Sequence, residues 1–126
     1  MILVFGGVYQ GKLDYVLERF NFADNDVYRC SDDDANTPGN KKVIYEIDKW
    51  ILALVKKDID VEKAIQQCVD SNQDSVVICN DVSCGVVPLD PELRKWREAV
   101  GRSLAILSKN SKEVIRLFCG IPARVK

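Results

Sequence analysis

A glycine-rich segment near the start of the chain has the residue types and spacing of a phosphate-binding loop. It reads Gly6-Gly7-Val8-Tyr9-Gln10-Gly11-Lys12-Leu13. This matches the pattern G-x-x-x-x-G-K, with leucine where serine or threonine would follow. Glycines let backbone N–H groups turn toward a phosphate, Lys12 adds a positive charge, and the next helix adds its dipole. The segment predicts nucleotide binding through residues 6–13; the alternative is a tight strand-to-helix turn with a solvated lysine.

Leu13 removes the hydroxyl that normally holds Mg²⁺ in such a loop. A metal would then be held by substrate phosphates, water and a carboxylate such as Asp81 or Glu46. Leu13 itself is expected to face the core. Asp81 has a second interpretation as a capping or loop-ordering carboxylate, and Asn80 beside it is similarly divided between structure and binding.

The elements that must position these residues alternate along the chain. The patterns predict strands at 2–5, 26–30, 42–46, 75–79 and 113–119, the last of these before Gly120-Ile121-Pro122. They predict helices at 12–20, from residue 47, at 61–69 with Asp60 as N-cap, and from Asp90-Pro91.

This alternation indicates one α/β domain over residues 1–126, with a mainly parallel sheet and helices on both faces. Ligands bind beyond the carboxyl ends of the strands in such sheets. We therefore expect the glycine loop to meet Asn80-Asp81, and more weakly Glu46 and Asp48, which follow two other strands.

The composition is that of an ordinary soluble protein and excludes several classes. The chain has 126 residues, 18 basic and 19 acidic side chains, and a net charge of -1, which gives no bulk attraction to nucleic acid or to a membrane. No apolar stretch approaches the roughly 20 residues of a membrane-spanning helix, and we expect a cytoplasmic protein. Its five cysteines form no C-x-x-C pair and have no histidine beside them, so free, mostly buried thiols are expected. Cys79 or Cys84, beside the expected site, could be reactive.

Several motifs in the second half of the chain resemble one enzyme family. They are Asn80-Asp81-Val82-Ser83-Cys84-Gly85-Val86-Val87-Pro88, then Leu93-Arg94, Trp96-Arg97, Gly101-Arg102 and Gly120-Ile121-Pro122. They resemble the N-E-V-G-x-G-I-V-P string, the R-x-x-R-x-x-x-G-R helix and the terminal G-x-P of the adenosylcobinamide kinase/adenosylcobinamide-phosphate guanylyltransferase family. That family also begins with a strand and G-G-x-x-S-G-K-S. The resemblance is strong over residues 1–20 and 76–126, and weak between.

The resemblance implies a P-loop NTPase-like domain that assembles as a homotrimer and acts in cobalamin biosynthesis or salvage. The family phosphorylates a corrinoid side-chain hydroxyl and then transfers GMP to that phosphate. For this chain it implies ATP or GTP with Mg²⁺ as cofactors and a corrinoid such as cobinamide as substrate. Lys12 and Asp81 would be the catalytic residues, with Asn80 and the loop contacting the nucleotide and Asp81 or Glu46 holding the metal.

The chain departs from the family in three respects. It contains no histidine, whereas the family carries GMP on one, so guanylyl transfer by that route is excluded. The segment that holds this histidine is shortened to about residues 21–41. Leu13 replaces the loop's last serine, and the family's Walker-B-like acid falls at Tyr45 or, one residue off, at Glu46. Asp81 stands where the family has glutamate.

The sequence thus predicts a kinase-like protein without the transferase activity. An inactive paralogue that binds a nucleotide or corrinoid, with an interaction or regulatory role, is the alternative. A purely structural oligomer, in which Lys12 has no phosphate to bind, is a third possibility.

Overall fold

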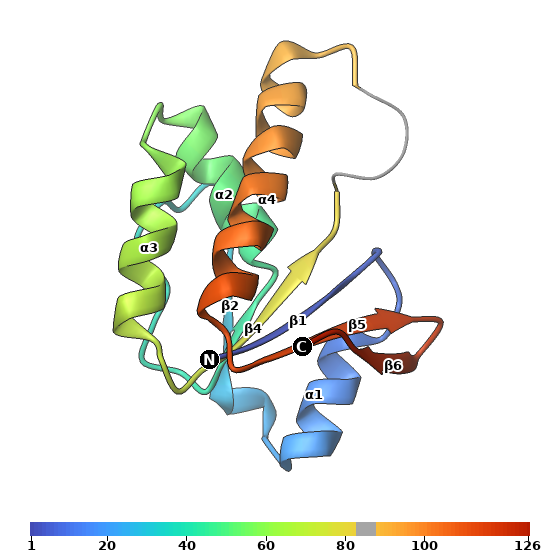
Figure 1. Ribbon diagram of the computed structural model, residues 1–126. Coiled ribbons are helices and arrows are strands. Elements are labelled where there is room, and N and C mark those ends of the chain that lie inside the picture. The colour runs from blue at the N-terminus through green and yellow to red at the C-terminus, as the bar shows by residue number, and fades with distance from the viewer. Residues whose placement is uncertain (83–87) are drawn as a thin grey trace.

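A six-stranded sheet organises the structure, a computed structural model that describes residues 1–82 and 88–126 (Figure 1). Its strands are β1 (Ile2–Gly6), β2 (Val27–Arg29), β3 (Val43–Tyr45), β4 (Val76–Asn80), β5 (Glu113–Phe118) and β6 (Ile121–Arg124). Their order across the sheet is β2-β3-β4-β1-β5-β6. All neighbours pair in parallel except β5 and β6, which are antiparallel.

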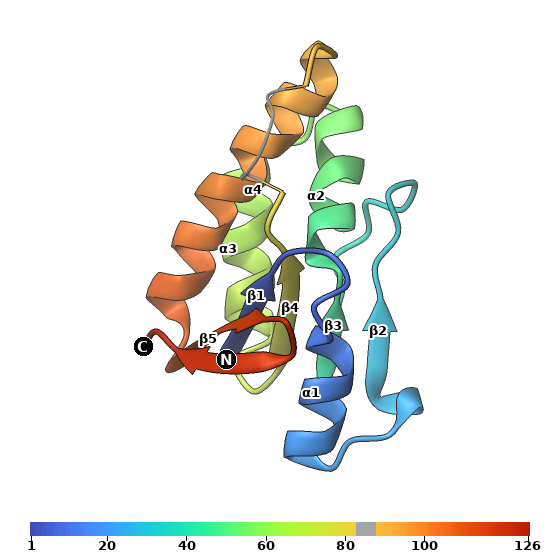
Figure 2. The same ribbon diagram turned by 90° about the vertical axis from the view of Figure 1, so that its right-hand side faces the viewer.

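The helices cover the two faces of the sheet unequally. They are α1 (Lys12–Phe20), α2 (Ile47–Lys56), α3 (Val61–Ser71) and α4 (Pro91–Asn110). In both views α1 packs on one face, and α2, α3 and α4 pack on the other (Figures 1 and 2). This arrangement confirms the predicted α/β class and is consistent with a P-loop NTPase-like domain.

Alternation along the strands divides the core in two, since successive strand residues point to opposite faces. In β1, Leu3 joins the core under the three helices and Val4 joins the core under α1; both are fully buried. In β4, Val77 likewise joins the core under the three helices and Ile78 joins the core under α1. Strands buried on both faces read as continuous apolar runs, which is why these two were recognisable from the sequence.

Helices α3 and α4 start with a side-chain cap, whereas α1 and α2 do not. Asp60 accepts a hydrogen bond from the Lys63 N–H (3.2 Å) and Asp90 accepts one from the Glu92 N–H (2.8 Å), which confirms both predicted N-caps. The N-cap of α1 is Gly11, a left-handed residue (φ 81°) that has no side chain to accept such a bond. The first N–H groups of α1 therefore have no side-chain acceptor from their own cap.

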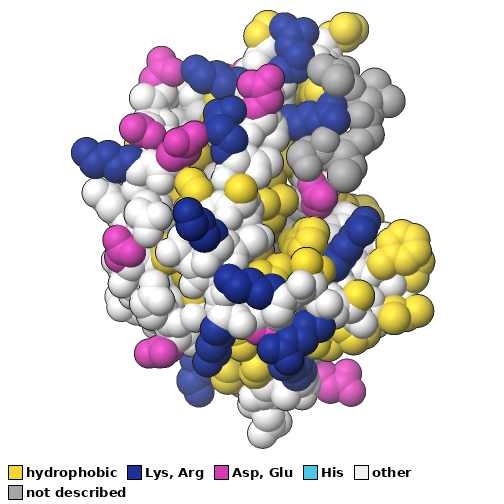
Figure 3. Space-filling model, viewed as in Figure 1, with side chains coloured by type: hydrophobic (Ala, Val, Ile, Leu, Met, Phe, Trp, Pro, Cys, Tyr) yellow, Lys and Arg dark blue, Asp and Glu magenta, His cyan; other side chains and the backbone are white. Residues whose placement is uncertain are grey.

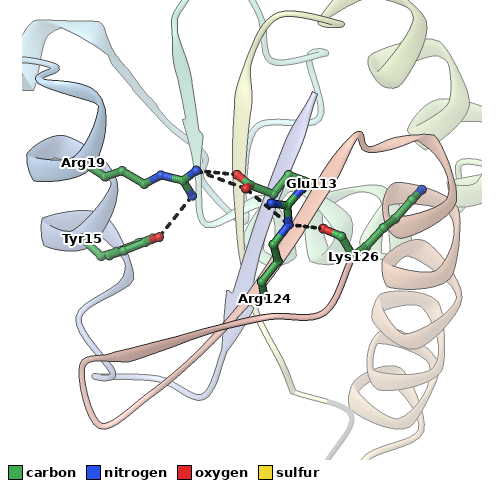
Figure 4. Close-up of polar contacts among 5 residues, drawn as sticks. All are labelled: Tyr15, Arg19, Glu113, Arg124 and Lys126. Carbon is green, nitrogen blue, oxygen red and sulfur yellow. Dashed lines mark hydrogen bonds and ion pairs between the residues drawn. The ribbon is translucent and has the colours of Figure 1, made fainter.

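A charged cluster holds α1 against β5 and the chain end (Figure 4). Glu113, whose side chain is 12% exposed, pairs with the Arg19 guanidinium at 2.7 Å and with Arg124 at 3.7 Å. Arg19 also donates to the Tyr15 hydroxyl (3.1 Å), and Arg124 donates to the Lys126 carbonyl (2.9 Å). The cluster joins the helix that follows the glycine loop to the β5–β6 hairpin.

The last strand was not predicted. The segment after residue 119 forms a further strand, β6, instead of an irregular end. All of its residues are exposed and it contains Pro122, so it lacks the buried alternation that marks a strand in sequence. Residues 83–87, within the Asn80 to Pro88 string that carries the family resemblance, lie outside the described residues. Within the described ranges, no helix combines the length and apolar character needed to cross a membrane.

Candidate active site

A cleft of about 820 Å³ lies at the carboxyl ends of the central strands. The described residues that line it are Val8, Tyr9, Gln10, Gly11, Lys12, Leu13, Asp14, Asp32, Tyr45, Glu46, Asp48, Lys49, Leu52, Asn80, Val82 and Trp96. One wall is therefore the glycine loop with the start of α1. The other wall is formed by the ends of β3 and β4 and the start of α2, as the parallel topology predicts.

Backbone geometry explains the glycines of the loop. A Cβ atom on Gly6 would lie 2.3 Å from the Leu117 carbonyl oxygen, so β5 approaches the end of β1 too closely for any side chain. Gly11 adopts a left-handed conformation, and Tyr9 does so as well with φ 62°, which is unusual for an aromatic residue. These turns carry the chain from β1 into α1 within a few residues.

Lys12 is held at the base of the loop. Its side chain is buried (5% exposed), and its Nζ donates a hydrogen bond to the Gly7 carbonyl oxygen at 2.5 Å. Burial lowers the pKa of Lys12, and the nearby Asp48 carboxylate opposes that shift. The ammonium group thus lies inside the loop, bonded to a carbonyl that an anion could displace.

Asp48 is the most enclosed acid of the opposite wall. It is 3% exposed; its Oδ1 accepts the Asn80 backbone N–H at 3.0 Å and its Oδ2 accepts the Asn80 side-chain amide at 3.3 Å. The Trp96 indole N–H donates to the Asp48 carbonyl at 2.8 Å, which joins α4 to this corner. Burial raises the pKa of Asp48, although the bonds from Asn80 counter the shift.

Sequence reasoning gave Asp48 too little weight. The sequence marks Asp48 only as a weaker candidate after the middle strand, because an acid at the end of a strand is often simply exposed. Its burial depends on Asn80, which lies 32 residues further along the chain. No local pattern carries that information.

Glu46 and Asn80 come together as expected. Glu46 is the left-handed N-cap of α2 (φ 58°), accepts the Asn80 side-chain amide at 3.5 Å and pairs with Lys49 at 3.1 Å. Asp81 lies at the rim: its backbone N–H donates to the Gly6 carbonyl at 2.8 Å, and it is not among the described residues that line the cleft. The catalytic and metal roles of Asp81 stay predictions.

Leu13 contacts both the core and the cleft. It is half-buried, packs against the core under α1, as expected of a core-facing residue, and also lines the cleft. An aliphatic group thus occupies the position from which a loop hydroxyl would reach a metal. Across residues 1–82 and 88–126, no group of three or more histidine, cysteine or acidic residues is placed to hold a metal ion. The donor set suits a metal carried mainly by nucleotide phosphates and water, as Mg²⁺ often is.

Most of the cysteines in the part of the chain that the structure describes are buried. Cys30, Cys68, Cys79 and Cys119 are free thiols there, and only Cys119 is exposed among them. Burial raises the pKa of Cys79 well above its ordinary value, so this thiol stays protonated and unreactive. Cys84, the other candidate, lies outside the described residues.

The family of the chain follows from a comparison with known proteins. A family model described as cobinamide kinase / cobinamide phosphate guanyltransferase matches residues 34–125. The chain belongs to this family. Membership confirms the resemblance noted in the sequence and places the chain among nucleotide-binding proteins of cobamide biosynthesis and salvage, whose substrates are a nucleotide and cobinamide.

The match also shows which half of the cleft is tied to the family. It includes Glu46, Asp48, Asn80 and Trp96, and it begins after the glycine loop. The predicted phosphate-binding role of the loop therefore depends on the loop's own residues and geometry. A search among curated proteins found no match.

Proposed function

We propose that this chain binds ATP or GTP through the glycine loop and acts as a cobinamide kinase without guanylyltransferase activity. One observation carries the proposal: the uncapped start of α1 and the buried Lys12 face Asp48 and Asn80 across one cleft. Backbone N–H groups and an ammonium on one wall suit a phosphate chain. The polar groups on the other wall suit an acceptor hydroxyl and its surroundings.

The reaction is phosphoryl transfer. The acceptor hydroxyl oxygen forms a bond to the γ-phosphorus and its proton passes to solvent, while the bond from that phosphorus to the β–γ bridging oxygen breaks and ADP or GDP leaves. Such catalysis consists mainly of positioning and charge neutralisation. In this chain Lys12 would neutralise phosphate charge, and Asn80, fixed by Asp48 at two atoms, would orient groups at the acceptor side. Mg²⁺, held through the nucleotide with Asp81 or Glu46 beside it, would supply further charge neutralisation when bound.

Two features favour a second function, a nucleotide- or corrinoid-binding protein without turnover. Leu13 gives the metal no hydroxyl ligand, and the chain contains no histidine to carry a guanylyl group. A binding protein would use the same cleft, so the two functions differ in turnover and not in the location of the ligand. The homotrimer and the cytoplasmic location implied by resemblance and composition stay predictions under either function.

Thermal denaturation with ATP and with GTP, each with and without Mg²⁺, tests nucleotide binding. We expect a rise in the melting temperature that is lost in Lys12→Ala and kept in Lys63→Ala, an exposed lysine on α3. The absence of any shift in the native chain would overturn the kinase and the nucleotide-binding protein, and would leave only corrinoid binding.

Phosphorylation of cobinamide then separates the two functions. Transfer of labelled γ-phosphate to cobinamide supports the kinase, and intact nucleotide binding with zero turnover supports the binding protein. Leu13→Ser should raise turnover and strengthen the effect of Mg²⁺ if the missing hydroxyl limits catalysis.

A further inference from the structure

The glycine loop contacts the β5–β6 hairpin at two points far from it in sequence. At its start, Gly6 lies against the backbone of Leu117, close enough to exclude a side chain. At its far end, Gln10 bonds to the hairpin turn: its side-chain Oε1 accepts the Cys119 N–H, and its carbonyl oxygen accepts the Gly120 N–H at 3.2 Å. Figure 1 shows the loop after β1 passing beside this hairpin.

The turn presents its amides to Gln10 because of its backbone shape. Cys119 and Gly120 adopt left-handed conformations with φ 50° and 74°, the pattern of the tight turns that join antiparallel strands. Both N–H groups of the turn are thereby directed at one residue of the loop. The Gln10 side chain crosses the loop to reach them, and its Cγ lies 3.7 Å from the place of a Cβ on Gly7.

We propose that Gln10 is a positioning residue that couples the glycine loop to the β5–β6 turn, so that phosphate bound at the loop orders the turn. The tie requires a side chain of this length, and the serine that the family pattern has at this position is too short to span the same gap. The coupling through Gln10 is therefore a feature of this chain and not of the family pattern.

The tie links the cleft to an apolar part of the surface. Phe118 and Ile121, which flank the turn, are 64% and 67% exposed, and Tyr9 of the loop is 98% exposed. Figure 3 shows hydrophobic side chains gathered at this end of the molecule. If a ligand orders the turn, it would thus also fix the positions of Phe118 and Ile121 relative to Tyr9, which otherwise depend only on the short hairpin.

Amide hydrogen exchange without ligand tests the tie itself. In Gln10→Ala we expect the Cys119 amide to exchange about tenfold faster, which corresponds to about 1.4 kcal/mol. The Gly120 amide should show a smaller increase. Gln10→Glu keeps an acceptor at the same reach and should keep the slow exchange. Gln66→Ala, which changes an exposed glutamine on α3, is the matched control and should leave both amides unchanged. An unchanged Cys119 amide in Gln10→Ala would overturn the inference.

A second variant tests the coupling from the hairpin side. Gly120→Ala strains the left-handed turn, where a Cβ would meet no neighbouring atom within 4 Å, so its effect is confined to backbone conformation. We expect faster exchange of the Tyr15 amide, which bonds the Gly11 carbonyl at the end of the loop (3.0 Å). An unchanged Tyr15 amide would count against coupling.

The ligand half of the inference rests on the proposed nucleotide site, and exchange in the presence of ATP or GTP tests it. Protection should extend from the loop to Cys119 in the native chain, and in Gln10→Ala it should stop at the loop, a difference that a merely structural role would not produce. Protection of the native loop without the turn would overturn the coupling alone. If no native amide responds to either nucleotide, the proposed function fails together with the ligand half, while the exchange rates without ligand still decide the tie.

Discussion

The two faces of the sheet are built differently. Under α2, α3 and α4 lies a large core that includes Trp50, 1% exposed, and Leu54, also 1% exposed. Under α1 the core is smaller, and Leu13 and Leu17 of that helix are only half-buried. Apolar burial is the dominant source of stability, so the three-helix face contributes most of it.

The candidate site joins these unequal halves. Asp48 and Asn80 belong to the stable three-helix side, whereas the glycine loop and Lys12 are attached to α1 and held from outside by the β5–β6 turn and the Glu113 cluster. One wall of the cleft is thus fixed by the main core. The other wall depends on a few polar ties, and it is the wall proposed to bind phosphate.

The largest expected difference in stability is between the same substitution, leucine to alanine, on the two faces of the sheet. Leu54→Ala should lower the free energy of unfolding by about 2–5 kcal/mol, because a buried cavity is left under α2. Leu17→Ala on α1, where the side chain is only half-buried, should lower the free energy of unfolding by about 1 kcal/mol, since solvent and neighbouring side chains can fill the space. Urea denaturation of both variants measures the pair. Equal losses would refute the inequality of the two faces.

Alkaline pH should weaken the three-helix face in particular. Burial raises the pKa of the Cys30 thiol to about 12 and of the Cys68 thiol to about 11, from an ordinary value of 9.0. Above pH 9 these thiols ionise in the unfolded chain but stay protonated in the folded one, so stability falls as the pH rises. Each thiol should cost roughly 1.4 kcal/mol at pH 10.

Urea denaturation of the reduced protein at pH 8 and pH 10 measures this effect. Cys30→Ala should remove one thiol's share of the loss. A loss that is the same in Cys30→Ala and in the native chain would contradict the assignment.

A third comparison concerns helix starts. Asp60→Ala removes the cap of α3 and should lower stability by about 1 kcal/mol without changing the effect of nucleotide on the melting temperature. α1 has no such cap to lose, because Gly11 leaves its first N–H groups free of a side-chain acceptor. A change in the nucleotide effect in Asp60→Ala would show that the two faces are not independent.

The smallest effect is expected from the cluster that holds α1 to β5. Glu113→Gln should lower stability by about 0.5–1 kcal/mol, since the pairs with Arg19 and Arg124 are partly exposed. The loss should shrink in 1 M salt, where such pairs are screened. Glu98→Gln, an exposed change on α4, is the control, and an effect of Glu113→Gln that salt leaves unchanged would argue against an electrostatic tie.

The sequence predicted the features that depend only on residues close together in the chain. The bounds of α1 and the Asp60 and Asp90 caps follow from local patterns, and alternating strands and helices gave the parallel sheet. Contacts set by the packing of distant segments could not be predicted. The burial of Asp48 requires Asn80 on another strand, and the acceptor for the Cys119 amide lies 109 residues earlier in the chain.

The central place of β1 has a consequence for synthesis. Its two neighbours in the sheet are β4 and β5, which are made much later than β1 itself. Until the second half of the chain emerges from the ribosome, β1 has no strand to pair with and the glycine loop has neither Leu117 nor the hairpin turn to rest on. Distant pairings of this kind form slowly. The candidate site therefore takes its shape only after β5 and the hairpin turn have been translated, well after β1 and the glycine loop themselves.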